Sequence, residues 1–175
     1  MLAPPLLFAA FWIHGETDDD LVNWPLGMVL ILAGVTLRVW AQQHLRHRLR
    51  QAMRLTTSGP YRFIRNPLYV GNTLVCVGAT FLSELLWWVP VTLAWCCILY
   101  AFVVRFEEKH LQGLYGAQYQ EYRSSVPRWF PRRFSFDNLG MMNNNLWASL
   151  RAESAGLLII LPYILKEIVE PFVRR

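Results

Sequence analysis

The chain has 175 residues, of which 54% are hydrophobic and 17% charged, and its mean hydropathy is +0.25. Soluble domains carry about 25% charged residues, so this composition excludes an ordinary soluble globule and favours an all-α integral membrane protein, with one domain over residues 1–175. The net charge of +5 does not indicate a nucleic-acid partner, because Lys and Arg cluster beside apolar runs, as expected for contact with a lipid bilayer.

The first half of the chain predicts two membrane helices. Residues 2–13 are apolar and predict a retained first helix, since no basic region precedes them and the acidic stretch at 14–20 is a poor cleavage site. The run 24–41 would extend about 27 Å as a helix, which is close to the thickness of a bilayer core.

The second half predicts a helical hairpin followed by an ambiguous tail. The apolar runs 68–82 and 85–106 are separated only by Ser83-Glu84, which predicts two helices joined by a tight turn. The C-terminal part, 140–175, contains an apolar stretch at 146–173 that carries several charged residues, so it either crosses the membrane or lies at its interface. We therefore expect four to five transmembrane helices.

Two basic connectors set the expected orientation. Residues 42–66 and 107–133 hold most of the seventeen Lys and Arg residues, and the hairpin between them makes an even number of crossings. Both connectors therefore face the same side, which the positive-inside rule makes cytoplasmic. We expect an inner (cytoplasmic) membrane protein whose active site lies on the cytoplasmic side.

Two segments beside the hairpin carry more chemistry than a connector needs. The stretch GPYRFIRNPLYVGN (59–72) mixes proline, glycine, arginine and tyrosine, which does not suit a continuous helix. The stretch EEKHLQGLYGAQYQEYRSSVPRWFP (107–131) predicts a helix that ends before Pro127. One face of that helix carries Leu111, Tyr115, Tyr119 and Tyr122. Because both segments adjoin the open end of the hairpin, they can form two halves of one pocket.

In this order, the two segments resemble the isoprenylcysteine carboxyl methyltransferase family, whose wider group includes the phospholipid N-methyltransferases. The family pattern runs G-x-Y, R-H-P-x-Y-x-G, a helical hairpin, E-E-x-x-L, F-G-x-x-Y-x-x-Y and V-P, and the resemblance covers about residues 50–133. The matching residues here are Gly59, Tyr61, Arg65, Pro67, Tyr69, Gly71, Glu107, Glu108, Leu111, Gly116, Tyr119, Tyr122, Val126 and Pro127. The family histidine is replaced by Asn66, whose amide can hold a cofactor but cannot transfer a proton near neutral pH.

The resemblance implies a small helical membrane enzyme that uses S-adenosyl-L-methionine without a Rossmann domain, and no GxGxxG is present. It implies a cofactor pocket formed by the loop before helix three and the segment after helix four. The implied cofactor-binding residues are Arg54, Leu55, Thr56, Tyr61, Arg65, Asn66, Pro67, Leu68, Tyr69, Glu108, Tyr119 and Tyr122. The implied catalytic residues are Glu107 and Arg105. Tyrosine faces suit adenine and a sulfonium cation, and methyl transfer depends mainly on alignment and exclusion of water.

Other polar and small residues are interpreted structurally. Gly71 and Gly78 lie seven apart, which favours close helix packing. His44 and His47 are interpreted as headgroup contacts, since they stand beside several arginines. Arg128-Trp129 is interpreted as an interfacial anchor, with a lid over the cofactor as the alternative. No metal site is expected, because the three cysteines lie inside apolar stretches without ligand spacing.

The expected function is a methyltransferase that acts on a lipophilic or membrane-partitioning acceptor. The acceptor group stays open between an isoprenylcysteine-like carboxylate, a lipid amine, a thiol and a hydroxyl, and the oligomeric state is also open. Two alternatives belong to other classes. One is an NADPH-dependent sterol-type membrane reductase, in which the arginines at 46–54 would bind the 2′-phosphate. The other is a non-enzymatic, lipid-binding membrane protein.

Overall fold

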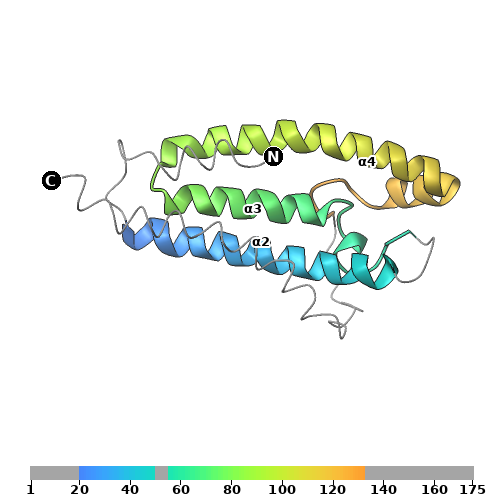
Figure 1. Ribbon diagram of the computed structural model, residues 1–175, viewed down its shortest axis with the longest axis horizontal. Helices are drawn as coiled ribbons and strands as arrows, with labels where there is room; N and C mark the ends of the chain where they lie inside the picture. The colour runs from blue at the N-terminus through green and yellow to red at the C-terminus, as the bar shows by residue number, and fades with distance from the viewer. Residues whose placement is uncertain (1–19, 50–54, 133–175) are drawn as a thin grey trace.

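The computed structural model describes residues 20–49 and 55–132, and in this part of the chain every regular element is a helix. The elements are α2 (Asp20–Leu49), η1 (Gly59–Arg62), α3 (Pro67–Leu82), η2 (Leu86–Trp88) and α4 (Val89–Ser125). Three long helices lie side by side, with α3 between α2 and α4 (Figure 1). The helices expected at 2–13 and 146–173 lie outside the described residues.

The predicted hairpin is confirmed. Helix α3 begins at Pro67, whose missing N–H costs nothing in a first helical turn, and it ends at Leu82. The chain reverses at Ser83 and at Glu84, which has a φ of 61°. The Glu84 N–H donates to the carbonyl oxygen of Phe81 at 3.0 Å, and Ser83 Oγ donates to that of Thr80 at 2.7 Å. These bonds satisfy backbone groups at the end of α3, so the turn can be tight.

Helices α2 and α3 touch through glycines, as expected for Gly71 and Gly78. A Cβ built on Gly34 would lie 2.6 Å from the carbonyl oxygen of Gly71, and one built on Gly78 would lie 2.7 Å from that of Gly27. Such distances leave no room for a methyl group between the two backbones. The glycines therefore set the spacing of the two helices.

Helix α4 packs on the other side of α3 through small, partly polar side chains. Cys96 and Tyr100 of α4 join Cys76 and Ala79 of α3 in the buried core. Thr80 Oγ1 lies 3.0 Å from Oγ1 of Thr92 in α4, and it also donates to the carbonyl oxygen of Cys76 at 2.9 Å. These two threonine hydroxyls thus have partners, which avoids the cost of leaving them unpaired.

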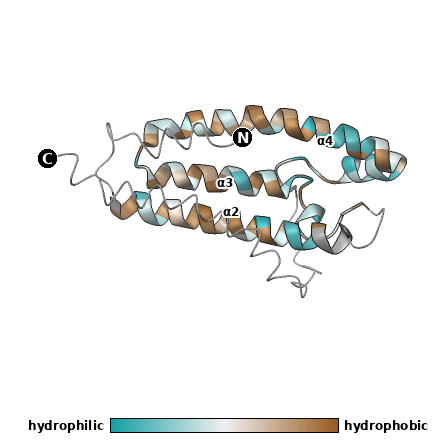
Figure 2. Ribbon diagram, viewed as in Figure 1, coloured by the Kyte–Doolittle hydropathy of each residue, from teal (hydrophilic) through white to brown (hydrophobic). Residues whose placement is uncertain are grey.

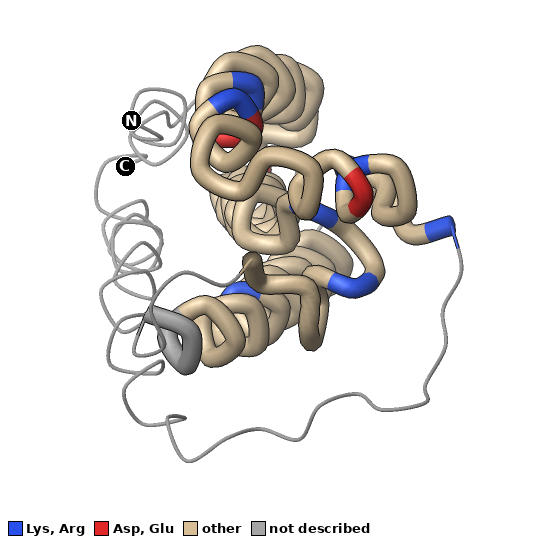
Figure 3. The backbone as a smooth tube through the Cα atoms, turned by 90° about the vertical axis from the view of Figure 1, so that its right-hand side faces the viewer, with Lys and Arg blue, Asp and Glu red and all other residues tan. Residues whose placement is uncertain are grey.

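Two helices of the described part are long and apolar enough to cross a membrane: Leu21–Leu45 and Leu86–Ser125. Helix α3 is apolar but shorter. The outer side of α4 exposes large apolar side chains such as Ile98 and Phe102. Hydrophilic residues gather toward the end of the molecule where α4 bends back (Figure 2), and several Lys and Arg positions surround this end in Figure 3.

A kink in α4 brings its last part to the site. Gly116 has φ 52° and ψ −123°, a conformation that residues with a side chain rarely adopt, and its carbonyl oxygen accepts a 3.0 Å hydrogen bond from Gln112 Nε2. The helix expected here is therefore kinked rather than straight, although Leu111 and Tyr115 still pack against Tyr119 and Tyr122. The chain nonetheless brings Tyr119 and Tyr122 together with Leu55 in one buried cluster.

Candidate active site

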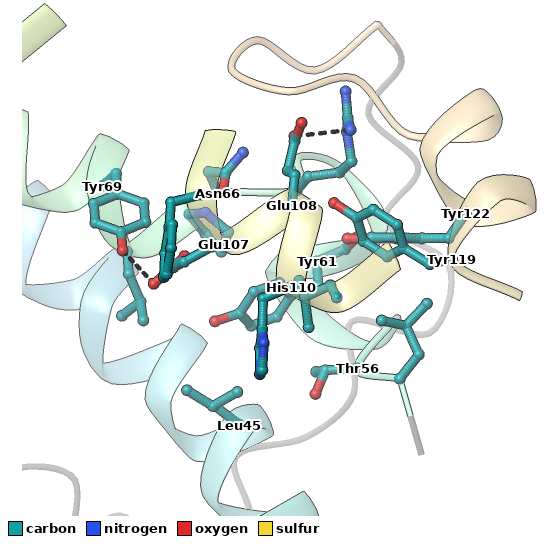
Figure 4. Close-up of a pocket in the computed structure, with 16 residues that line it drawn as sticks. Leu45, Thr56, Tyr61, Asn66, Tyr69, Glu107, Glu108, His110, Tyr119 and Tyr122 are labelled. Atoms are coloured by element: carbon teal, nitrogen blue, oxygen red, sulfur yellow. Dashed lines mark hydrogen bonds and ion pairs between the residues drawn. The ribbon is translucent and has the colours of Figure 1, made fainter. Parts of the chain in front are cut away.

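A cavity of about 330 Å³ lies at the polar end of the helices (Figure 4). It is formed by the end of α2, by residues 55–69, and by residues 106–122 of α4. Its volume falls within the range of about 300–1,000 Å³ that is typical of small-molecule sites. The lining residues are Leu45, Leu55, Thr56, Tyr61, Arg65, Asn66, Pro67, Leu68, Tyr69, Phe106, Glu107, Glu108, His110, Leu111, Tyr119 and Tyr122.

With one exception, the site residues predicted from the sequence that fall in the described part line this cavity. The exception is Arg105, whose side chain is exposed and is not part of the lining. Arg54 lies outside the described residues. The two segments predicted as half-pockets therefore do meet at the open end of the hairpin.

The prediction of the site left out four lining residues. Leu45 comes from α2, and no sequence signal shows how the end of that helix packs. Phe106, His110 and Leu111 flank the acidic pair on α4. His110 and Leu111 follow Glu107 by three and four residues, so the helical period would have placed them on its face of α4.

The end of α2 supports residues 55–66, here called the site loop. His44 Nδ1 lies 2.9 Å from Ser58 Oγ, and the His44 ring occupies the space where a Cβ on Gly59 would lie. Gly59 also has a φ of 59°, which favours glycine. His44 therefore anchors the loop, a role that its interpretation as a headgroup contact did not include. The structure does not describe the side chain of His47.

The segment after α4, residues 126–132, folds back onto the site loop and is here called the return segment. The backbone N–H of Arg65 donates to the carbonyl oxygen of Pro127 at 2.9 Å. Asn66 Nδ2 donates to the carbonyl oxygen of Arg128 at 3.3 Å. These two bonds join segments that are some sixty residues apart in the chain, and they hold two residues that line the cavity, Arg65 and Asn66.

Glu108 is held by two arginines. Its side chain is only 8% exposed, and its Oε1 atom lies 2.8 Å from Arg65 Nη1. Arg128 donates from Nε to Oε1 at 3.1 Å and from Nη2 to Oε2, so its guanidinium grips both carboxylate oxygens. This pairing raises the pKa of Arg128, because Glu108 stabilises the charged guanidinium. The interpretation of Arg128 as an interfacial anchor was therefore incomplete.

The Glu108 cluster carries an excess of positive charge. Two guanidinium groups and one carboxylate leave a net charge of +1, and Arg65 Nε is buried without a hydrogen-bond partner among the described residues. A buried donor without a partner favours a guest that can accept its hydrogen bond. This wall of the cavity is therefore suited to an anionic group such as a carboxylate.

A second carboxylate lies on the opposite side of the cavity from Tyr119 and Tyr122 (Figure 4). The Tyr69 hydroxyl donates to Glu107 Oε1 at 2.6 Å, and the Tyr69 ring packs against Tyr100 with a centroid distance of 4.9 Å. Tyr69 thus fixes the Glu107 side chain, whose second oxygen can accept a bond from a guest.

Tyr122 joins the kinked end of α4 to the site loop, because its hydroxyl donates to the Tyr61 carbonyl oxygen at 2.8 Å. Replacing Tyr122 with phenylalanine keeps the ring but removes this bond. We expect the free energy of unfolding to fall by about 1 kcal/mol, as measured by denaturant unfolding in detergent. Tyr100→Phe serves as the matched control, since the Tyr100 hydroxyl is buried without a hydrogen-bond partner among the described residues. A larger loss for Tyr100→Phe than for Tyr122→Phe would contradict this role.

Comparison with known proteins gives a family match and two curated relatives. The family model described as "Phospholipid methyltransferase" matches residues 22–118. The cobalt-zinc-cadmium resistance protein CzcN of Cupriavidus metallidurans is 32% identical over 123 residues, which are 68% of this chain and 55% of that protein. The nickel-cobalt-cadmium resistance protein NccN of Alcaligenes xylosoxydans xylosoxydans is 28% identical over 130 residues, which are 73% of this chain and 60% of that protein.

The matched part of this chain thus spans little more than half the length of these curated relatives. No solved structure matches the chain significantly. Among the described residues, no group of three or more His, Cys, Asp or Glu side chains is placed to hold a metal ion.

Proposed function

Since the chain belongs to the phospholipid methyltransferase family, we propose that it transfers the methyl group of S-adenosyl-L-methionine to a membrane-partitioning acceptor. The observation that carries the proposal is the cavity itself. Residues from the site loop and from α4, which the hairpin separates in sequence, line one space of suitable size beside apolar helices. The two groups of motif residues, one in the site loop and one in α4, are therefore proposed to bind the same ligand.

The residues present fit the cofactor. When bound, S-adenosyl-L-methionine supplies an electrophilic methyl group on a sulfonium sulfur. The tyrosine rings of Tyr61 and Tyr69 offer faces for adenine and for the sulfonium cation. The positive excess at Arg65, together with its unpartnered Nε, suits the cofactor carboxylate. Because both oxygens of Glu108 are engaged by arginines, we assign Glu108 to holding those arginines rather than to binding the ammonium group.

Glu107 is proposed to hold the acceptor. Its carboxylate is anchored by the Tyr69 hydroxyl, and it lies on the same helix as the exposed apolar residues Phe106 and Leu114, which are 76% and 61% exposed. A groove beside the cavity is lined by these two residues together with Lys109, His110 and Gly113. An acceptor with an apolar body could lie along this groove while its polar group reaches Glu107. Arg105, exposed on the same helix, stays a proposed contact for the acceptor.

The membrane arrangement is part of the proposal. Four to five crossings, a single domain over 1–175 and an inner-membrane location with the cavity on the cytoplasmic side are supported by the two long apolar helices and by the basic residues around the cavity. The same reasoning supports a lipid-soluble acceptor, because such a compound would reach the cavity from the bilayer.

Calorimetry with S-adenosylhomocysteine on the purified, folded protein tests the proposal. We expect saturable heat with this product analogue and none with NADPH, which separates a methyltransferase from the reductase alternative. Incubation with methyl-labelled cofactor and a total lipid extract should then place the label in the lipid fraction. A folded sample that gives no saturable heat with S-adenosylhomocysteine would rule the proposal out.

A further inference from the structure

His110 lines both the cavity and the groove beside it, and the function described above assigns no chemical role to its imidazole. It lies on α4 one helical turn beyond Glu107, so both side chains leave the helix on similar sides. Figure 4 shows its imidazole directed into the cavity, in the region of Leu45 and Tyr61. The side chain is exposed, and it therefore has access both to a guest in the cavity and to water.

The other titratable side chains that line the cavity already have partners. Glu107 accepts from Tyr69, and Glu108 is paired with Arg65 and Arg128. Tyr122 donates to a carbonyl oxygen, Tyr119 interacts with Arg65, and Tyr61 also has a partner. Among the titratable lining residues of the described part, His110 alone forms no hydrogen bond or ion pair.

The opposite wall cannot supply a proton acceptor of this kind. Asn66 lines the cavity where the family motif has a histidine, but its amide does not titrate, and it donates to the Arg128 carbonyl. An imidazole can take up and release a proton near neutral pH. His110 is therefore the lining residue whose chemistry and accessibility suit a general base.

We propose that His110 accepts the proton of the methyl acceptor, an inference that rests on the proposed methyltransferase function. The acceptor heteroatom forms a bond to the methyl carbon, and the bond from that carbon to the cofactor sulfur breaks with its electron pair remaining on sulfur. The proton carried by the heteroatom passes to the imidazole of His110 and from there to water. The substrate class is then a nucleophile that carries a proton, namely a thiol, a phenolic hydroxyl or an amine, and not a carboxylate.

The first test observes proton transfer without turnover. An alkylated nitrophenol, whose phenolate absorbs visible light, is added to the full-length protein loaded with S-adenosylhomocysteine. We expect the bound probe to be more ionised on the wild type than in detergent alone, and His110→Gln to abolish this increase. Binding of S-adenosylhomocysteine by His110→Gln is measured on the same samples, so that the ionisation of the probe is compared at equal occupancy of the cofactor site. Glu121→Gln, at an exposed position of the same helix that lines neither the cavity nor the groove beside it, is the matched control.

The second test follows transfer itself. With methyl-labelled cofactor, His110→Gln should slow methylation of the same phenol by about 10²-fold or more, which is the usual contribution of a general base. Added imidazole should restore part of the activity of His110→Ala. Wild type that methylates dodecanoate but none of the alkyl phenol, thiol and amine probes would overturn the proposal, as would undiminished phenol methylation by His110→Gln. Failure of wild type to bind S-adenosylhomocysteine would instead reject the proposed function, and this assignment with it.

Discussion

Replacing Glu108 with glutamine is expected to destabilise the protein by about 3 kcal/mol, because it leaves two guanidinium groups without their shared counter-charge. The estimate is at the lower end of the usual cost of breaking a buried pair, since the Arg128 side chain is 32% exposed and can turn toward water. The Arg65 side chain, which is 10% exposed, has less freedom to do so. Denaturant unfolding of the purified protein in detergent gives the measurement.

The same substitution should weaken binding of S-adenosylhomocysteine by at least about tenfold. Glu108 joins the site loop, through Arg65, to the return segment, through Arg128, so its loss releases the cavity-lining loop from the segment that supports it. Glu121→Gln is the matched control, because Glu121 is an exposed glutamate of the same helix and should change stability by no more than about 0.5 kcal/mol. Equal stability of the two variants would show that the ion pairs contribute nothing to the fold.

The second large effect is expected at the contact of α2 and α3. Alanine at Gly34 would place a methyl group 2.6 Å from the carbonyl oxygen of Gly71, and alanine at Gly71 would meet both Arg38 Cγ at 2.6 Å and the Gly34 carbonyl at 2.8 Å. Because the obstacles include backbone atoms, they cannot turn away as a side chain can. Each substitution should therefore lower the free energy of unfolding by about 2–3 kcal/mol, near the upper end of the range for overpacking.

A matched control with the opposite sign is available at Gly113. This glycine lies inside α4, and a Cβ built there meets nothing within 4 Å. Alanine at Gly113 should raise stability by about 0.5–1 kcal/mol, because alanine has the higher helix propensity and no clash opposes it. If Gly34→Ala and Gly113→Ala shift unfolding in the same direction, the close contact of the helices is not what holds α2 against α3.

The fold could be predicted where it follows from the order of apolar runs and turn residues in the sequence. Two apolar runs with Ser83-Glu84 between them allow little except a hairpin, and Pro67 marks the start of α3. The kink in α4 was missed because periodicity was extended through Gly116 as though the helix were straight. The signal was present in the residue itself, since glycine is the residue type that adopts its φ and ψ without strain.

The site could be predicted where its residues belong to the ordered motifs, and it could not be where they come from elsewhere. Leu45 lines the cavity and His44 contacts the site loop, and both come from α2. The packing of α2 depends on the glycine contact with α3, which nothing in the sequence around Leu45 and His44 indicates. Arg128 stands among Pro, Trp and Phe, a composition equally typical of a membrane interface. Its pairing with Glu108 follows only from the path of the return segment.

Asn66 shows what its position in the motif demands of a side chain. The amide of Asn66 reaches a main-chain oxygen of the return segment, and a main-chain oxygen is present whatever residue follows Pro127. An imidazole N–H of similar reach would satisfy the same acceptor. An amide and an imidazole can thus donate the same hydrogen bond at this point, and only the capacity to exchange protons distinguishes them. A relative with histidine at this position would keep the hydrogen bond to the return segment, and its cavity would have a second imidazole able to exchange protons.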